Sequence, residues 1–170
     1  MGARPNRSGT DLLGIYLNDH LAGATLGVRR ARSLAEADSE RAPELADAVR
    51  PVAIEIAEDR GALLEIMRRL DIPVRRYKVV AGTLAETVGR LKPNGRLVRR
   101  SPLTSMVELE LLRLGVEGKA AGWRTLRQVA DTDERLDATQ LDGLLSRAQR
   151  QLDTLEPLRL RQAADTFQRG

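Results

Sequence analysis

The chain has 170 residues, a length that suits one domain with its own hydrophobic core. It contains no cysteine, which excludes disulfides, thiol catalysis and thiolate metal sites, and its four aromatic residues argue against a platform for stacking nucleic-acid bases. The formal net charge is +4 and no run approaches roughly eighteen apolar residues, so we expect a cytoplasmic protein without membrane insertion.

A first helix is predicted over residues 10–37, after a flexible start at 1–8. Its apolar residues recur every three or four positions, as one buried helix face requires. They are Leu13, Leu17, Leu21, Ala24, Val28, Ala31 and Ala35. His20, the only histidine of the chain, lies beside this stripe.

A second helix is predicted over 43–70, because Pro43 suits the first turn and Pro73 follows the end. Pro51 predicts either a kink or a later start. The apolar seam has coiled-coil spacing and consists of Leu45, Val49, Val52, Ile56, Leu63, Ile66 and Leu70. Asp59 occupies the seam position between Ile56 and Leu63. An unpaired carboxylate is costly to bury, so we expect Asp59 to have a partner inside the protein.

Residues 71–100 form a long connection in which we predict a short helix at 77–91. Between Arg68 and Arg100 there are ten basic and two acidic residues, a local net charge of +8. Arginines outside the main helices are the candidates for binding a polyanion such as nucleic acid, or for pairing with acidic faces of the protein. These are Arg75, Arg76, Arg96, Arg99 and Arg100.

A third helix is predicted over 101–130, and it is apolar on two sides. One side carries Leu103, Val107, Leu111, Leu114, Gly118 and Ala121, with Glu110 and Glu117 among them. The other carries Leu109, Leu112, Val116, Trp123, Leu126 and Ala130. We expect Trp123 to be buried. One side of the helix should face the bundle, and the other should be covered by the connection or by another subunit in a homodimer. Glu117 faces inward only if the Trp123 side faces outward, and the sequence leaves both assignments open.

A fourth helix is predicted over 137–167, with Pro157 inside it. The first and last connections are short and make their helices antiparallel neighbours, whereas a link of thirty residues is long enough to cross the whole bundle. The predicted fold class is therefore all-α. We expect residues 9–168 to form a single up-and-down four-helix bundle with one long crossover between the second and third helices.

The chain from Thr10 to Phe167 resembles the ferritin-like superfamily. The segments YLNDHLAGAT (16–25) and GVEGKAAGWRTL (115–126) are similar to a group of actinobacterial helical proteins that brings no known activity. The ferritin-like resemblance implies a di-metal centre with a Glu on two helices and Glu-x-x-His on the other two. The corresponding motifs here, Glu55-x-x-Glu58 and Asp153-x-x-Glu156, both lack the histidine.

Helix geometry predicts a polar layer instead. In the expected topology His20, Asp59 and Glu117 lie at levels that agree within ~3 Å, and each lies near its apolar stripe. Glu55 has a similar height but points toward the edge of the bundle. Such a layer is either a structural network of carboxylates and imidazole or a site for Fe, Mn or Zn.

Glycines at Gly23, Gly27, Gly115, Gly118 and Gly122 suggest close approach of helix backbones, because glycine costs up to ~1 kcal/mol against alanine inside a helix. The sequence indicates no nucleophile or substrate pocket. We therefore expect a non-catalytic binding or structural protein without a cofactor. An iron- or manganese-dependent oxidoreductase or iron-handling protein is the first alternative, and a polyanion-binding protein the second.

Overall fold

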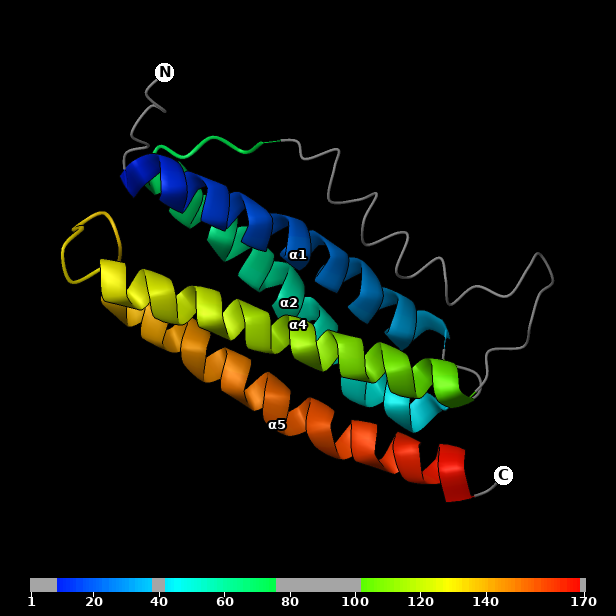
Figure 1. Cartoon of the computed structure of the whole chain (residues 1–170). Helices are drawn as coiled ribbons and strands as arrows, with labels where there is room; N and C mark the ends of the chain where they lie inside the picture. The colour runs from blue at the N-terminus through cyan, green and yellow to red at the C-terminus, as the bar shows by residue number, and fades with distance from the viewer. Residues whose placement is uncertain (1–8, 38–41, 76–101, 169–170) are drawn as a thin grey trace, which may run out of the picture.

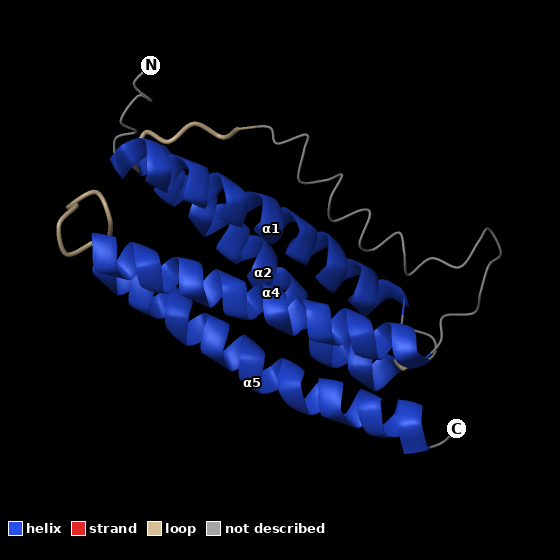
Figure 2. Cartoon of the chain, viewed as in Figure 1, coloured by secondary structure: helices blue, strands red, loops and turns tan. Residues whose placement is uncertain are grey.

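A computed structural model describes residues 9–37, 42–75 and 102–168, and in these ranges the chain forms helices without strands (Figures 1 and 2). The helices are α1 (Gly9–Ala37), α2 (Pro43–Arg69), α4 (Pro102–Val129) and α5 (Ala138–Gln168). They make up more than half of the chain, and every boundary lies within one residue of the prediction. The all-α fold class is confirmed.

Proline and local hydrogen bonds define several helix ends. Pro43 is the first residue of α2, and the helix continues through Pro51, so the predicted later start is wrong. At the other end Asp71 adopts a left-handed φ of 55°, and the Ile72 backbone N–H donates to the Met67 carbonyl at 2.9 Å. This closes the helix before Pro73. The Asp137 side chain accepts the Gln140 backbone N–H at 3.1 Å and caps the start of α5.

The helices form an up-and-down bundle. α1 packs on α2 and α4, and α5 packs on α4 and α2. α1 and α5 run in one direction and α2 and α4 in the other, so every pair of neighbours is antiparallel (Figure 1). The end of α2 and the start of α4 consequently lie at opposite ends of the bundle, as the long crossover required. The predicted short helix at 77–91 lies outside the described residues.

Two apolar clusters make up the core. One includes Val49, Val52 and Ile56 of α2 with Leu112 and Val116 of α4. The other includes Leu63 and Ile66 of α2 with Trp123 and Leu126 of α4. Trp123 is buried as predicted, with 3% of its surface exposed. The inner side of α4 is therefore the one that carries Trp123, whereas Leu103 and Leu114 on its other side are exposed.

None of the helices in the described ranges has both the length and the apolar character of a membrane-spanning segment.

Candidate functional site

A buried polar layer lies where the two apolar clusters meet. On α2 Asp59 occupies the seam position between Ile56 and Leu63. On α4 Lys119 occupies the equivalent position between Val116 and Trp123. Heptad spacing directs both side chains into the bundle, where their charges meet.

The Asp59 carboxylate accepts hydrogen bonds on both oxygens, and its side chain is 0% exposed. Lys119 Nζ donates to Oδ2 at 2.5 Å, and Gln151 Nε2 donates to the same oxygen at 3.2 Å. Arg147 on α5 donates to Oδ1 at 3.2 Å. The predicted burial of Asp59 is therefore confirmed, and two cations and an amide compensate the cost of burying its charge.

Gln151 of α5 connects the members of the layer. Its Oε1 accepts from Lys119 Nζ at 2.5 Å, while its Nε2 donates to Asp59 and, at 2.9 Å, to Glu55 Oε2. Burial lowers the pKa of Lys119 below its ordinary value, and the Asp59 carboxylate opposes that shift. Three helices are joined in one network of charge-assisted hydrogen bonds.

The four predicted metal ligands do not come together. Glu117 is turned outward: its side chain is 43% exposed and lies 3.9 Å from Arg113. This follows from the inward direction of the Trp123 side of α4. Asp59 and Glu55 share Gln151 as a donor. Within the described ranges no group of three or more His, Asp or Glu side chains is arranged to hold a metal ion. Metal binding itself stays a prediction.

His20 is half-buried on α1, and it takes no part in the described hydrogen bonds of Asp59. Its ring packs edge-on against Tyr16, with centroids 4.4 Å apart. A Cβ added to Gly122 would lie 3.0 Å from this imidazole, so the glycine makes room for it. Burial lowers the pKa of His20, and the nearby Asp19 carboxylate opposes the shift.

Of the predicted polyanion ligands, only Arg75 belongs to the described residues. It is exposed, and its backbone N–H donates to Asn18 Oδ1 at 2.6 Å. Arg76, Arg96, Arg99 and Arg100 lie outside the described residues, so polyanion binding stays a prediction.

Sequence reasoning missed Lys119, Arg147 and Gln151 as the partners of Asp59. For two of them the sequence did contain a signal, a polar residue at a heptad position of an apolar seam. Lys119 interrupts the seam of Leu112, Val116, Trp123 and Leu126 on α4 at a heptad position, and Gln151 does so between Ala148 and Leu155 on α5. A polar residue at such a gap is a candidate member of the same layer.

A cavity of about 500 Å³ adjoins the layer, between α1 and α4. Gly23 and Gly27 line it from α1, and Gly115, Gly118 and Gly122 line it from α4. A Cβ added at Gly23, Gly115 or Gly118 would meet nothing within 4 Å. The predicted close backbone approach is therefore wrong at these three positions, where the missing side chains leave open space instead.

The remaining lining of the cavity is mainly apolar, with a few polar groups. Leu111, Leu112, Val116 and Trp123 contribute apolar surface from α4, and Leu63 and Ile56 contribute from α2. The polar and charged groups of the lining are Asp59 and Arg60 of α2, Lys119 of α4, and Tyr16, Asp19, His20 and Arg30 of α1. A concave apolar site with a small number of placed polar groups is typical of small-molecule binding.

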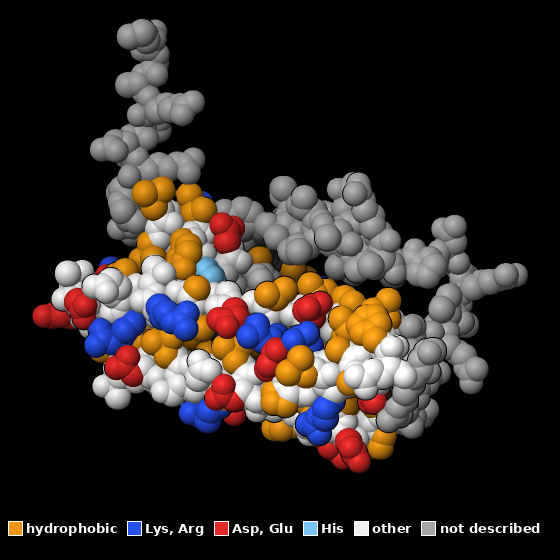
Figure 3. Space-filling view, turned by 60° about the horizontal axis from the view of Figure 1, so that its bottom comes forward, with side chains coloured by type: hydrophobic (Ala, Val, Ile, Leu, Met, Phe, Trp, Pro, Cys, Tyr) orange, Lys and Arg blue, Asp and Glu red, His pale blue; other side chains and the backbone are white. Residues whose placement is uncertain are grey.

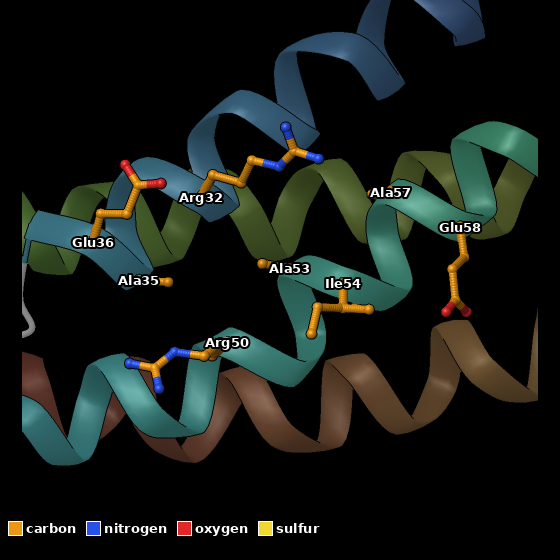
Figure 4. Close-up of a pocket in the computed structure, with 8 residues that line it drawn as sticks. All are labelled: Arg32, Ala35, Glu36, Arg50, Ala53, Ile54, Ala57 and Glu58. Atoms are coloured by element: carbon orange, nitrogen blue, oxygen red, sulfur yellow. The ribbon is translucent and has the colours of Figure 1, made fainter.

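A second, wider groove of about 770 Å³ runs along the outside of α1 and α2 (Figure 4). Ala35, Ala53 and Ala57 lie along it, and Arg32 and Arg50 extend from its two helices (Figure 4). Its charged lining residues are all exposed, whereas the α1–α4 cavity reaches the buried layer. The α1–α4 cavity is therefore the better candidate for specific binding.

Comparison with family models, with curated proteins and with solved structures finds no match for this chain. Membership of the ferritin-like superfamily stays an expectation from sequence.

Proposed function

We propose that the chain is a non-catalytic binding protein that takes a small, largely apolar molecule into the cavity between α1 and α4. The observation that carries this proposal is the mainly apolar cavity itself, whose two walls carry glycines with open space beside them. A glycine inside a helix costs up to ~1 kcal/mol against alanine, and here close packing does not offset that cost at three positions. A bound molecule would offset it.

The energetics of the cavity favour an apolar occupant. The apolar side chains that line the cavity face water, because the space beside Gly23, Gly115 and Gly118 is open to solvent. A guest that buries apolar surface gains about 25 cal/mol per Å². The volume of about 500 Å³ lies within the ~300–1,000 Å³ of small-molecule sites.

The polar layer is better suited to fixing the positions of the helices than to transferring protons. Both oxygens of Asp59 are engaged by donors, and Lys119 and Gln151 bond to each other as well as to Asp59. Groups held in this way specify the rotation and register of helices. We therefore assign the layer to the architecture and the adjoining cavity to binding.

Trp123 provides the assay, because it is the only tryptophan and it lines the cavity. We expect the neutral dye N-phenylnaphthylamine to bind with a change in Trp123 fluorescence. The double variant Gly23→Leu with Gly118→Leu places side chains into the space and should abolish binding. The matched control is Gly61→Leu with Gly143→Leu, two exposed helical glycines that also have open space but lie outside the cavity lining.

Two results would overturn the proposal. One is a wild-type protein that does not bind the dye. The other is equal binding by the cavity-filling variant and the wild type, which would place the dye on the hydrophobic patches of the outer surface (Figure 3).

A further inference from the structure

The buried carboxylate at the cavity is already occupied by donors. Asp59 accepts on both oxygens from Lys119, Gln151 and Arg147. The Thr25 hydroxyl donates to the Leu21 carbonyl at 2.8 Å and accepts from Arg60 Nε at 3.0 Å. Of the acidic residues in the described lining, only Asp19 is exposed to solvent.

Several donors at the same cavity are not occupied within the described part of the chain. Trp123 is 3% exposed, and its indole Nε1 has no hydrogen-bond partner there. Lys119 Nζ donates to Asp59 and Gln151, which uses two of the three N–H groups of an ammonium. The described contacts of Arg60 engage its Nε alone, which leaves the terminal nitrogens of its guanidinium.

The three residues that carry these donors all line the cavity. Lys119 and Trp123 are four residues apart on α4, so they share a face one turn apart. Arg60 follows Asp59 directly on α2, and its bond to Thr25 connects α2 to α1. A buried N–H without an acceptor is unfavourable, so the Trp123 indole favours a ligand that supplies an acceptor.

Charge points in the same direction. Asp59 is the buried carboxylate of the lining, and its charge is shared between Lys119 and Arg147. Arg60 adds another cation at the cavity without an ion pair in the described residues. Glu58 pairs with Arg147, and Glu55 accepts from Gln151, so the acids and bases of the layer itself are balanced. An incoming anion would therefore meet Arg60 as the cation of the lining that the described ion pairs leave unpaired.

We propose that the natural ligand is a molecule with one apolar alkyl chain and one carboxylate. The carboxylate accepts hydrogen bonds from Lys119, Arg60 and Trp123, and the body lies along the glycine-lined walls. This inference rests on the proposed function and adds the chemical class of the ligand.

Three probes with the same chain test the class: dodecanoate, dodecanol and dodecylammonium, each used to displace N-phenylnaphthylamine. We expect dodecanoate to bind at least about tenfold more tightly than dodecanol, since hydrogen bonds to a charged group are worth about 1.5–3 kcal/mol. Dodecylammonium should bind most weakly. The Gly23→Leu with Gly118→Leu variant should bind none of the three.

Two variants locate the carboxylate. Arg60→Gln should reduce the preference for dodecanoate over dodecanol several-fold, because the carboxylate loses more than the neutral hydroxyl when a cationic donor is removed. Trp123→Phe, followed by calorimetry, should do the same because it removes the indole N–H and keeps an aromatic ring. Arg124→Gln is the matched control, since it removes an equal charge from an exposed α4 position outside the cavity lining, and it should leave the preference intact.

The outcomes separate the two proposals. If the dye binds in the cavity but dodecanoate and dodecanol bind equally, or dodecylammonium binds best, the carboxylate class is wrong and the binding function stands. If Arg124→Gln lowers the preference as much as Arg60→Gln does, the effect is one of net charge, and the assigned contacts are wrong. If nothing binds in the cavity, both proposals fail.

Discussion

Replacing Asp59 by alanine should strongly destabilise the fold, and the structure indicates which group carries the cost. Arg147 would keep its bond to Glu58 at 2.8 Å, and Gln151 would keep Glu55 at 2.9 Å. Lys119 would keep only Gln151 Oε1, with its side chain 13% exposed. A buried cation that loses its carboxylate costs about 3–5 kcal/mol. Release of its proton limits the cost, because burial already lowers the pKa of Lys119.

The conservative change Asp59→Asn should cost less, about 1–3 kcal/mol, because the amide oxygen still accepts from Lys119. The matched control is Glu58→Ala, the neighbouring acid on α2, whose side chain is 58% exposed and also pairs with Arg147. A surface pair of this kind is worth about 0–1 kcal/mol.

Urea unfolding followed by far-UV circular dichroism and by Trp123 fluorescence measures these differences. A change in midpoint at constant slope reports stability alone. If Asp59→Ala costs no more than Glu58→Ala, Asp59 is not the buried centre of the layer and the reasoning fails.

Three further predictions concern neighbouring groups. Because burial lowers the pKa of Lys119, the unfolded state binds more protons between the folded-state pKa and the ordinary value of 10.5. The unfolding free energy of the wild type should therefore rise relative to Lys119→Met as pH increases through that window, and urea midpoints that stay parallel would contradict this. The single histidine should titrate in the NMR spectrum below its ordinary pKa of 6.5, and a pKa above that value would mean that His20 is not desolvated. Gly118→Ala should stabilise the protein by up to about 1 kcal/mol, because its Cβ enters open space. Gly122→Ala should not, because its Cβ meets the His20 ring, and equal melting temperatures of the two variants would count against the cavity geometry.

The helices and the burial of Asp59 could be predicted from sequence because they depend on local patterns. Proline positions, capping residues and apolar spacing specify where a helix begins, where it ends and which stripe it buries. Helix α2 has only one continuous apolar stripe, so the inward position of Asp59 within that stripe followed directly. The need for a buried partner followed from the cost of isolating its charge.

The rotation of α4 could not be predicted in the same way. Both of its sides are apolar, so periodicity alone does not distinguish an inward Glu117 from an inward Trp123. Packing against α1 and α5 decides between them, and it places Lys119 rather than Glu117 in the layer. The partners of Asp59 on α4 and α5 are therefore a property of the assembled bundle.

The glycines likewise separate what the sequence determines from what the tertiary structure determines. Their spacing in the sequence marks positions where side chains are absent, and it is equally compatible with helices in contact and with a gap between them. The distance between α1 and α4 depends on all the side chains packed around both helices. Only the tertiary structure decides that Gly23, Gly115 and Gly118 border a cavity while Gly122 makes room for His20.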